Sequence, residues 1–307
     1  MKLALTRNAI IPVHPSSLRV IMKVMLAEYS VCTGMDASLR REGAAMLKTL
    51  KAAFEAAGCT VSVPSDFDAD FRRTADACDA GLVIAPDEVL ADYTEVLEEY
   101  CINLGSSPAA TRLCADKKEA TELLLHNGLY APRIVREDEP VKCVVKPRTG
   151  CGSEGIFISD RPVEKEGYIS TEFVEGEHLS VSLAAGKGWI LPLTLNRQHI
   201  NINDGIDYDG NDVNISHPAT AEIFRAAVTA GHMAGCRGLF GVDVVFGKHP
   251  WIVDINPRPT TTIVGVVNVI DANVADLMLM GHFGAMPPEI HRKGTYSFTK
   301  RDLEEFL

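Results

Sequence analysis

The amino-terminal third of the chain alternates short apolar runs with an amphipathic segment. Residues 38–57 carry apolar side chains at helical spacing, and Gly58 follows them as a helix cap. Short apolar runs predict strands at residues 2–5, 60–63 and 81–85. Strands that alternate with a helix in this way indicate a small parallel sheet.

After a predicted helix at residues 116–126, the pattern changes to apolar runs separated by short turns. This series predicts a mostly antiparallel sheet. Its strands are expected at residues 141–146, 155–158, 167–174, 178–184 and 190–195. Later elements are predicted to be helices at 220–234 and 273–280 and a hairpin formed by 241–246 and 251–255. The polar segment 299–307 is expected to be peripheral.

Length and charge narrow the range of functions. The 307 residues are enough for about two domains, and a formal net charge of -11 gives no reason to bind nucleic acid. No apolar run reaches the roughly 18 residues of a membrane span, and the amino terminus does not resemble a signal peptide. None of the eight cysteines form a CxxC pair, which favours a reducing compartment. We therefore expect a cytoplasmic protein that binds neither nucleic acid nor membrane.

A glycine-rich loop follows directly after a β-branched strand that ends in Lys146. Gly150, Gly152 and Gly155 would let backbone amides wrap phosphate oxygens. The same residues also fit a plain hairpin that carries a surface lysine, and taken alone they leave both interpretations open. Cys151 lies in this loop, and we interpret it as incidental because no neighbour in the sequence marks an activated thiolate.

Two acidic positions lie in the predicted hairpin near the end of the sheet. Asp254 and Asn256 are two apart and share one face of a strand, and Asp243 lies in the strand before it. If the two strands pair, three oxygen ligands of the kind that Mg²⁺ prefers converge, and Arg258 follows at once. The alternative is that these side chains face solvent, but their apolar neighbours make unpaired carboxylates costly there.

The order of these motifs resembles that of the ATP-grasp carboxylate–amine ligases. The likeness spans residues 113–262 and comprises Asp116-Lys117, Lys146, the glycine loop, the segment 171–181, and Asp243 with Asp254, Asn256 and Arg258. It implies an ATP-grasp fold, of α/β and α+β class, behind a small parallel-sheet domain of pre-ATP-grasp type. The implied domains are residues 1–112, a small lobe at 113–177 and a large lobe at 178–307.

The resemblance also implies a nucleotide site. Lys117 and Lys146 match the lysines that bind the phosphates of ATP. The loop residues that would cover the phosphates are Gly150, Gly152, Ser153 and Gly155. The segment that would hold adenine comprises Glu172, Phe173, Val174 and Glu175. Glu177 is assigned to the ribose, although His178 stands where the family usually has a carboxylate, so either residue could serve.

The resemblance assigns the metal and the chemistry as well. Asp243, Asp254 and Asn256 match the ligands of Mg²⁺, with Mn²⁺ as an alternative ion. The family usually has glutamate at position 254, so a slightly displaced metal is expected. Arg258 and Lys146 are the expected catalytic residues. They would stabilise an acyl phosphate, formed from a carboxylate and ATP, until an amine attacks it.

The segments 27–34, 39–50 and 195–200 are similar to those ATP-grasp ligases that join glutamate to tyramine in methanofuran biosynthesis. Arg197 is then a candidate for binding the amino-acid carboxylate, and Tyr208 for stacking on an aromatic amine. The alternatives are a surface arginine paired with acids of a loop at 203–212, and an ordinary turn tyrosine. Glu42 and His14 could also touch substrate, although such side chains are usually solvated.

Other functions fit the same motifs. The chain could join a different amino acid and amine, transfer phosphate to a hydroxyl or phosphate acceptor, or bind ATP as a sensor without chemistry. An intact set of metal ligands argues against the sensor. The expected partners are small-molecule carboxylate and amine substrates, and a homodimer is an expectation by analogy alone.

Overall fold

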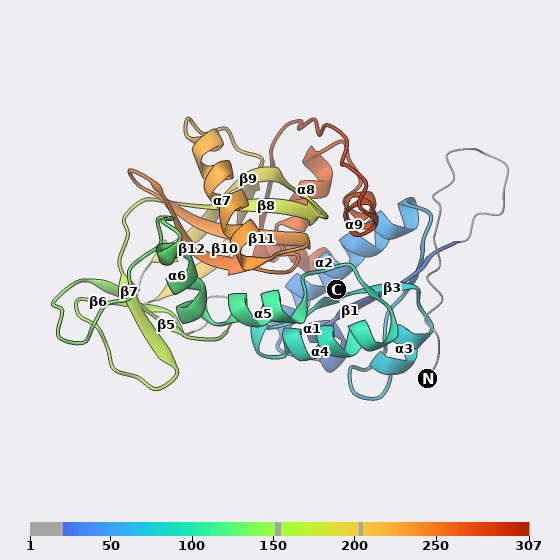
Figure 1. Cartoon of the computed structure of the whole chain (residues 1–307), viewed down its shortest axis with the longest axis horizontal. Helices are drawn as coiled ribbons and strands as arrows, with labels where there is room; N and C mark the ends of the chain where they lie inside the picture. The colour runs from blue at the N-terminus through green and yellow to red at the C-terminus, as the bar shows by residue number, and fades with distance from the viewer. Residues whose placement is uncertain (1–20, 151–154, 203–204, 307) are drawn as a thin grey trace.

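The structure is a computed structural model that describes residues 21–150, 155–202 and 205–306. It contains three sheets arranged along the molecule, with the small antiparallel sheet at one end and the parallel sheet toward the other (Figure 1). The strand predicted at residues 2–5 lies outside the described residues. Among the described helices, none combines the length and apolar character needed to cross a bilayer.

The amino-terminal domain is built on a parallel sheet of strand order β2-β1-β3-β4. Its strands are β1 (Lys23–Glu28), β2 (Thr60–Ser62), β3 (Ala80–Ile84) and β4 (Ile102–Asn103). The helices that accompany them are α1 (Tyr29–Thr33), α2 (Ala37–Ala56), α3 (Phe71–Asp76) and α4 (Asp87–Tyr100). The predicted parallel sheet is therefore confirmed, as is the long helix that follows residue 37.

Two helices, α5 (Pro108–Ala115) and α6 (Lys117–His126), lead to a three-stranded antiparallel sheet of order β6-β5-β7. Its strands are β5 (Cys143–Pro147), β6 (Phe157–Ser159) and β7 (Tyr168–Glu172). Asp116 caps α6, because its side chain accepts hydrogen bonds from the amides of Lys118 and Glu119. The cap fixes where α6 begins, and so where Lys117 lies.

The third sheet has six strands in the order β12-β11-β8-β9-β10-β13. Its strands are β8 (Glu177–Gly186), β9 (Trp189–Ile202), β10 (Ile206–Val213), β11 (Gly238–Phe246), β12 (Pro250–Asn256) and β13 (Tyr296–Thr299). Helices α7 (Thr220–Ala234), α8 (Ile263–Val269) and α9 (Val274–Phe283) pack against it, and the 3₁₀ helix η1 (Lys300–Phe306) follows β13. The predicted antiparallel pairing and the hairpin of β11 with β12 are confirmed.

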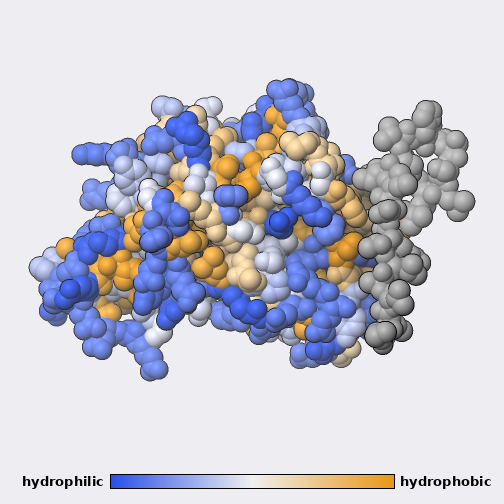
Figure 2. Space-filling view, viewed as in Figure 1, coloured by the Kyte–Doolittle hydropathy of each residue, from blue (hydrophilic) through white to orange (hydrophobic). Residues whose placement is uncertain are grey.

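One hydrophobic core runs across the boundary between the amino-terminal domain and the six-stranded sheet. It joins Leu50 and Phe54 of α2 to apolar residues of α8 and α9, and Leu303 of η1 belongs to it. Hydrophilic residues cover most of the outer face seen in Figure 2, with apolar patches between them. Because α2 packs in the same hydrophobic core as the large lobe, its position relative to that lobe is fixed. The helix thus forms one wall of the space between the amino-terminal domain and the large lobe.

The structure corrects several expectations. Residues 206–213 belong to strand β10 rather than to the expected loop, whose Asp- and Gly-rich composition resembles a turn. The segment after Thr299 is not peripheral, because Leu303 is buried and η1 packs on α2. Strand β1 and helices α3, α4, α5 and α8 were not predicted. The β-branched sequence of α8, IVGVVNV, is more typical of a strand.

Gly210 should be indispensable to the junction of β10 with β13. It has φ +147°, at a register shift in β10, and an added Cβ would lie 2.0 Å from the Phe298 carbonyl oxygen. We expect Gly210→Ala to lower the free energy of unfolding by about 2 kcal/mol or more, through strain and overpacking together. Urea denaturation at neutral pH measures this change.

Gly188→Ala is the matched control, because Gly188 also has a positive φ, of +86°, but nothing lies within 4 Å of an added Cβ. It should cost only about 1 kcal/mol, from backbone strain alone. Equal losses in the two variants would contradict the steric argument.

Candidate active site

A pocket opens where the three sheets meet, and residues of all three sheets line it. The amino-terminal domain contributes the end of β1 and one side of α2, the small sheet contributes β5 and β7, and the large sheet contributes β8 to β12. The pocket has an apolar end beside the segment after β7, a charged middle, and a second polar end beside α2.

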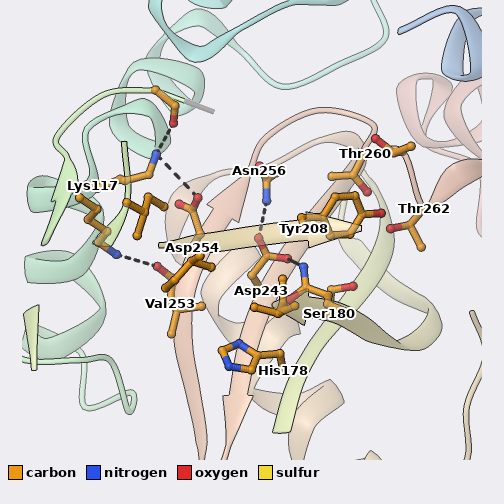
Figure 3. A pocket seen from close by; sticks show the side chains of 18 of the residues that line it. Lys117, His178, Ser180, Tyr208, Asp243, Val253, Asp254, Asn256, Thr260 and Thr262 are labelled. Carbon is orange, nitrogen blue, oxygen red and sulfur yellow. Dashed lines mark hydrogen bonds and ion pairs between the residues drawn. The ribbon is translucent and has the colours of Figure 1, made fainter. Parts of the chain in front are cut away.

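The charged middle contains two carboxylates that face each other across the β11–β12 ladder. Asp243 is the register partner of Asp254, and the Asn256 amide donates to Asp243 Oδ2 over 3.1 Å (Figure 3). Gln198 of β9 donates to the other oxygen of Asp243 over 3.0 Å. Desolvation, followed by the charge of Asp254, raises the pKa of Asp243 to about 7. The predicted convergence of Asp243, Asp254 and Asn256 is thus present in the fold.

Two buried lysines reach the same place from the small lobe. Lys117 Nζ lies 3.7 Å from Asp254 Oδ2 and donates to the Gly150 carbonyl oxygen over 2.6 Å (Figure 3). Lys146 Nζ donates to the Val253 carbonyl oxygen over 3.1 Å. Burial lowers the pKa of Lys146, and the charge of Lys117 adds to the effect while Asp254 opposes it. Both ammonium groups are therefore held beside the carboxylates by the backbone of other elements.

Arg258 completes the charged middle together with a residue that the sequence did not single out. Its guanidinium lies 3.9 Å from Asp87 at the start of α4, and Asp87 Oδ2 lies 3.5 Å from Lys117 Nζ. Burial raises the pKa of Asp87, although Arg258 and Lys117 both lower it. Asp87 follows Pro86 at a helix start, where an acidic residue is common for structural reasons, so the sequence carried no specific signal.

An ion pair at the back of the site joins the elements that carry the two lysines. The guanidinium Nε of Arg148 lies 2.8 Å from Asp116, and the Lys117 amide donates to the Arg148 carbonyl oxygen over 2.8 Å. Burial opposes ionisation of Asp116, but hydrogen bonds from Arg148 and from the amides of Glu119 and Lys118 outweigh it, so its pKa is lowered. This clamp ties the start of α6 to the end of β5.

The apolar end of the pocket lies beside the predicted adenine segment. Glu172, Phe173 and Val174 line it, together with Val144, Val181 and Val245. Glu175 and Glu177 are not among the lining residues, whereas His178 is. Glu177 instead pairs with Arg197 over 3.2 Å, and both side chains are about half exposed. Gly152 and Ser153 of the predicted phosphate cover lie outside the described residues, while Gly150 lines the pocket.

Alternation along β9 separates two neighbouring side chains. Gln198 and Ile200 line the pocket, but Arg197, between Asn196 and Gln198, does not. Its guanidinium forms an ion pair with Glu177, and Asp212 of β10 is its register partner. We therefore withdraw Arg197 as the residue for an amino-acid carboxylate.

The second polar end of the pocket lies between α2, β10 and η1. Tyr208 of β10, predicted as a candidate for stacking on an aromatic amine, lines this end. Glu42 of α2 and Lys300 of η1 line it as well. Glu28 at the end of β1 also faces this end, where its Oε2 accepts hydrogen bonds from Ser30 Oγ and the Val31 amide. Helix α2 can lie this close because residue 43 is glycine. A Cβ there would lie 2.3 Å from Ser30 Oγ and 2.4 Å from Glu28.

Comparisons with known proteins agree with this geometry. The family model of the ATP-grasp domain matches residues 114–262, and that of the pre ATP-grasp 3 domain matches residues 30–111. The chain is 32% identical over 285 residues to the tyramine–L-glutamate ligase of Methanocaldococcus fervens, which covers 83% of this chain and 92% of that one. The chain belongs to the ATP-grasp family.

Two further relatives support the assignment. The tyramine–L-glutamate ligase of Methanocaldococcus jannaschii is 31% identical over 294 residues, or 86% of this chain and 90% of that one. The crystal structure of an ATP-grasp superfamily protein from Archaeoglobus fulgidus superposes with a TM-score of 0.76 at 29% identity, over 91% of this chain and 98% of that one. The protein is therefore an ATP-dependent, ADP-forming carboxylate–amine ligase, and the predicted family, fold and enzyme class are confirmed.

The Asp116–Arg148 clamp makes a prediction about stability. Asp116→Asn keeps a side chain that can cap α6 but removes the charge, so the free energy of unfolding should fall by about 1–2 kcal/mol at pH 7. Because the folded-state pKa of Asp116 is lowered, the clamp's contribution is present above the unfolded pKa of about 4 and is lost as pH falls below it. Urea denaturation at pH 7 and at pH 3 measures both effects.

Asp138→Asn is the control. Its ion pair with Arg136 is exposed, with 79% and 71% of the two side chains accessible, and should be worth less than about 0.5 kcal/mol. A loss in Asp116→Asn no larger than that in Asp138→Asn, or one that persists undiminished at pH 3, would argue against the clamp.

Proposed function

We propose that this ligase activates the side-chain carboxylate of glutamate with ATP and joins it to the amine of tyramine. The observation that carries the ligase chemistry is the meeting of Asp243 and Asp254 with Lys117 and Lys146 in one pocket. The proposed substrates are supported by sequence comparison, because about one third of the residues are identical to those of two tyramine–L-glutamate ligases over most of the chain. The proposal places the reaction in methanofuran biosynthesis, as the sequence likeness implied.

The carboxylates suit a divalent cation of the magnesium type. Asp243 and Asp254 offer hard oxygen ligands, and burial, followed by the charge of Asp254, raises the pKa of Asp243, so a bound cation would stabilise its ionised form. Among the described residues, no group of three or more His, Cys, Asp or Glu side chains could hold a metal unaided. Asp243, Asp254 and Asn256 would hold Mg²⁺, with Mn²⁺ as an alternative, together with phosphate oxygens. The ion would neutralise phosphate charge when bound.

The cationic side chains have separate roles in the proposal. Lys117 and Lys146 bind the phosphates of ATP, since each ammonium is buried and fixed by a backbone carbonyl. Arg258 stabilises the charge of the acyl phosphate, because it lies on the side of the pocket toward Glu28 and Asp87. No side-chain nucleophile is required, since the amine itself displaces phosphate from the acyl phosphate.

The adenine end follows from the apolar lining. Val144, Phe173 and Val174 provide flat apolar contacts for a base, and the segment 172–175 supplies backbone groups beside them. His178, which lines the pocket, replaces Glu177 in the proposal as the residue nearest the ribose. In keeping with this layout, we retain residues 1–112, 113–177 and 178–307 as the proposed domains, with the nucleotide between the second and the third.

The first experiment measures ADP release from Mg-ATP with glutamate and tyramine, and identifies the product by mass spectrometry. We expect turnover only when both substrates are present, with a glutamyl amide of tyramine as product. Replacing tyramine by tyrosine, or glutamate by aspartate, tests the specificity. Efficient amide formation with another pair and none with glutamate and tyramine would overturn the substrates but keep the ligase.

Asp254→Asn should lower kcat by about 100-fold or more, because it removes one carboxylate of the metal site while preserving shape. Asp160→Asn, at an exposed position away from the pocket, is the control and should leave kcat unchanged. Turnover by Asp254→Asn at the wild-type rate would exclude the proposed role of Asp254.

A further inference from the structure

The second polar end of the pocket contains charges that phosphate and metal binding do not use. Glu42 comes from α2, Lys300 from the first position of η1, and Tyr208 and Asn211 from β10. They are separated by as many as 258 positions in the sequence, yet all four line the pocket. We call these four residues the far cluster. Phosphate and metal binding do not explain why three separate elements bring these four residues together at the pocket.

Glu42 and Lys300 form an ion pair inside the pocket. Lys300 Nζ lies 3.4 Å from Glu42 Oε1, and the two side chains are only 26% and 17% accessible. Thr261 Oγ1 donates to the other carboxylate oxygen of Glu42 over 2.8 Å, which fixes its orientation. The pair thus presents one positive and one negative group side by side to the pocket, with Glu42 held by Thr261 as well as by Lys300.

Asn211 adds a polar atom that protein groups leave unused. Its side chain is 1% exposed, and its amide nitrogen donates to Tyr208 Oη over 2.6 Å and to Thr262 Oγ1 over 3.0 Å. Its Oδ1 is buried and accepts no hydrogen bond from any residue that the structure describes. A buried acceptor of this kind is costly unless a ligand donates to it.

Tyr208 connects the far cluster to the charged middle of the pocket. Lys300 Nζ lies 5.6 Å from the centre of its ring, and both Glu42 and Asp243 contribute to the raised pKa of its hydroxyl, after burial. In Figure 3 the ring lies between Asp243 and Thr262. A ligand that contacts the far cluster and extends along Tyr208 would therefore reach Asp243 and its neighbours.

We propose that Glu42, Lys300 and Asn211 recognise the ammonium and carboxylate groups on the α-carbon of the amino acid that the enzyme activates. Lys300 binds the α-carboxylate, and Glu42 with Asn211 Oδ1 binds the α-ammonium. A zwitterion brings both complementary charges at once, so neither partner of the Glu42–Lys300 pair is left buried without an opposite charge.

This arrangement determines which carboxylate reacts. With the α-carbon groups held at the far cluster, the side chain of the amino acid runs along Tyr208 toward Asp243. The substrate class is then an α-amino acid with a second carboxylate, and the second carboxylate is the one activated. The inference rests on the proposed function, because it places the amino acid of that reaction in the same pocket.

The test pairs substrate analogues with variants. Glutamate, 4-aminobutanoate, which lacks the α-carboxylate, and glutarate, which lacks the α-ammonium, are compared as substrates of the wild type, Lys300→Met and Glu42→Gln. We expect Lys300→Met to raise KM for glutamate by about tenfold or more while KM for 4-aminobutanoate hardly changes. Likewise, Glu42→Gln should no longer prefer glutamate over glutarate as the wild type does. Values of KM for Mg-ATP and tyramine within about twofold of wild type show that each variant is folded.

Arg301→Met is the matched control, because Arg301 is the exposed cation next to Lys300 on the same 3₁₀ turn. It should behave as wild type. An effect of Lys300→Met on glutamate no larger than that of Arg301→Met overturns the inference. The same conclusion follows if Lys300→Met still prefers glutamate over 4-aminobutanoate as strongly as the wild type does.

A calorimetric titration separates this inference from the proposed function. If the wild type makes no glutamyl amide of tyramine, the proposed function is wrong, and the other α-amino acids are titrated into wild type and Lys300→Met with Mg-ATP present. Binding that Lys300→Met abolishes supports the far cluster as a site for α-amino acids. The inference is overturned if the wild type binds none of these amino acids, or if Lys300→Met binds them as the wild type does.

Discussion

Two neighbouring carboxylates, Asp243 and Asp254, repel each other, and the residues around them must offset that repulsion. Asp243 and Asp254 face each other across one ladder, inside a sheet whose other neighbours are apolar. Two acids so placed are unfavourable by themselves, and Lys117 on one side and the amides of Gln198 and Asn256 on the other reduce that cost. The carboxylates and the buried cations beside them together offer partners for a cation and for the phosphates that accompany it. The clamp of Asp116 with Arg148 matters for the same reason, since it holds the two lysine-bearing elements together.

The sequence could predict those site residues that lie close together in the chain or at a fixed position in a regular strand. Asp254 and Asn256 share a face because side chains alternate along a strand, and Asp243 meets them because a short turn joins β11 to β12. Lys117 follows a helix cap and Lys146 ends a strand, so both carry local signals. The same alternation predicts that Arg197 and Gln198 point to opposite sides of β9, and of these two Gln198 is the one that lines the pocket.

The remainder depends on contacts between segments far apart in the chain. Asp87 comes from a helix start in the amino-terminal domain, and Lys300 comes from a polar segment that resembles a solvated tail. No local pattern distinguishes them from ordinary surface charges, because only the packing of distant elements, such as η1 on α2, brings them to the pocket. Strand β10 was missed for a related reason: its aspartates and Gly210 have the composition of a turn, while its partners β9 and β13 supply the pairing.

The glycine at position 43 determines how closely α2 can approach β1, and so the shape of one wall of the pocket. Because no side chain fits there, α2 packs closely against the end of β1, and Met35, Leu39 and Met46 line the pocket from α2 and the segment just before it. These three are apolar side chains, in contrast to the charged residues of the same pocket. Substitutions at these three positions would reshape this wall of the pocket without removing any of its charged groups. The fold thereby separates the residues that set the shape of the wall from those that carry the charge of the pocket.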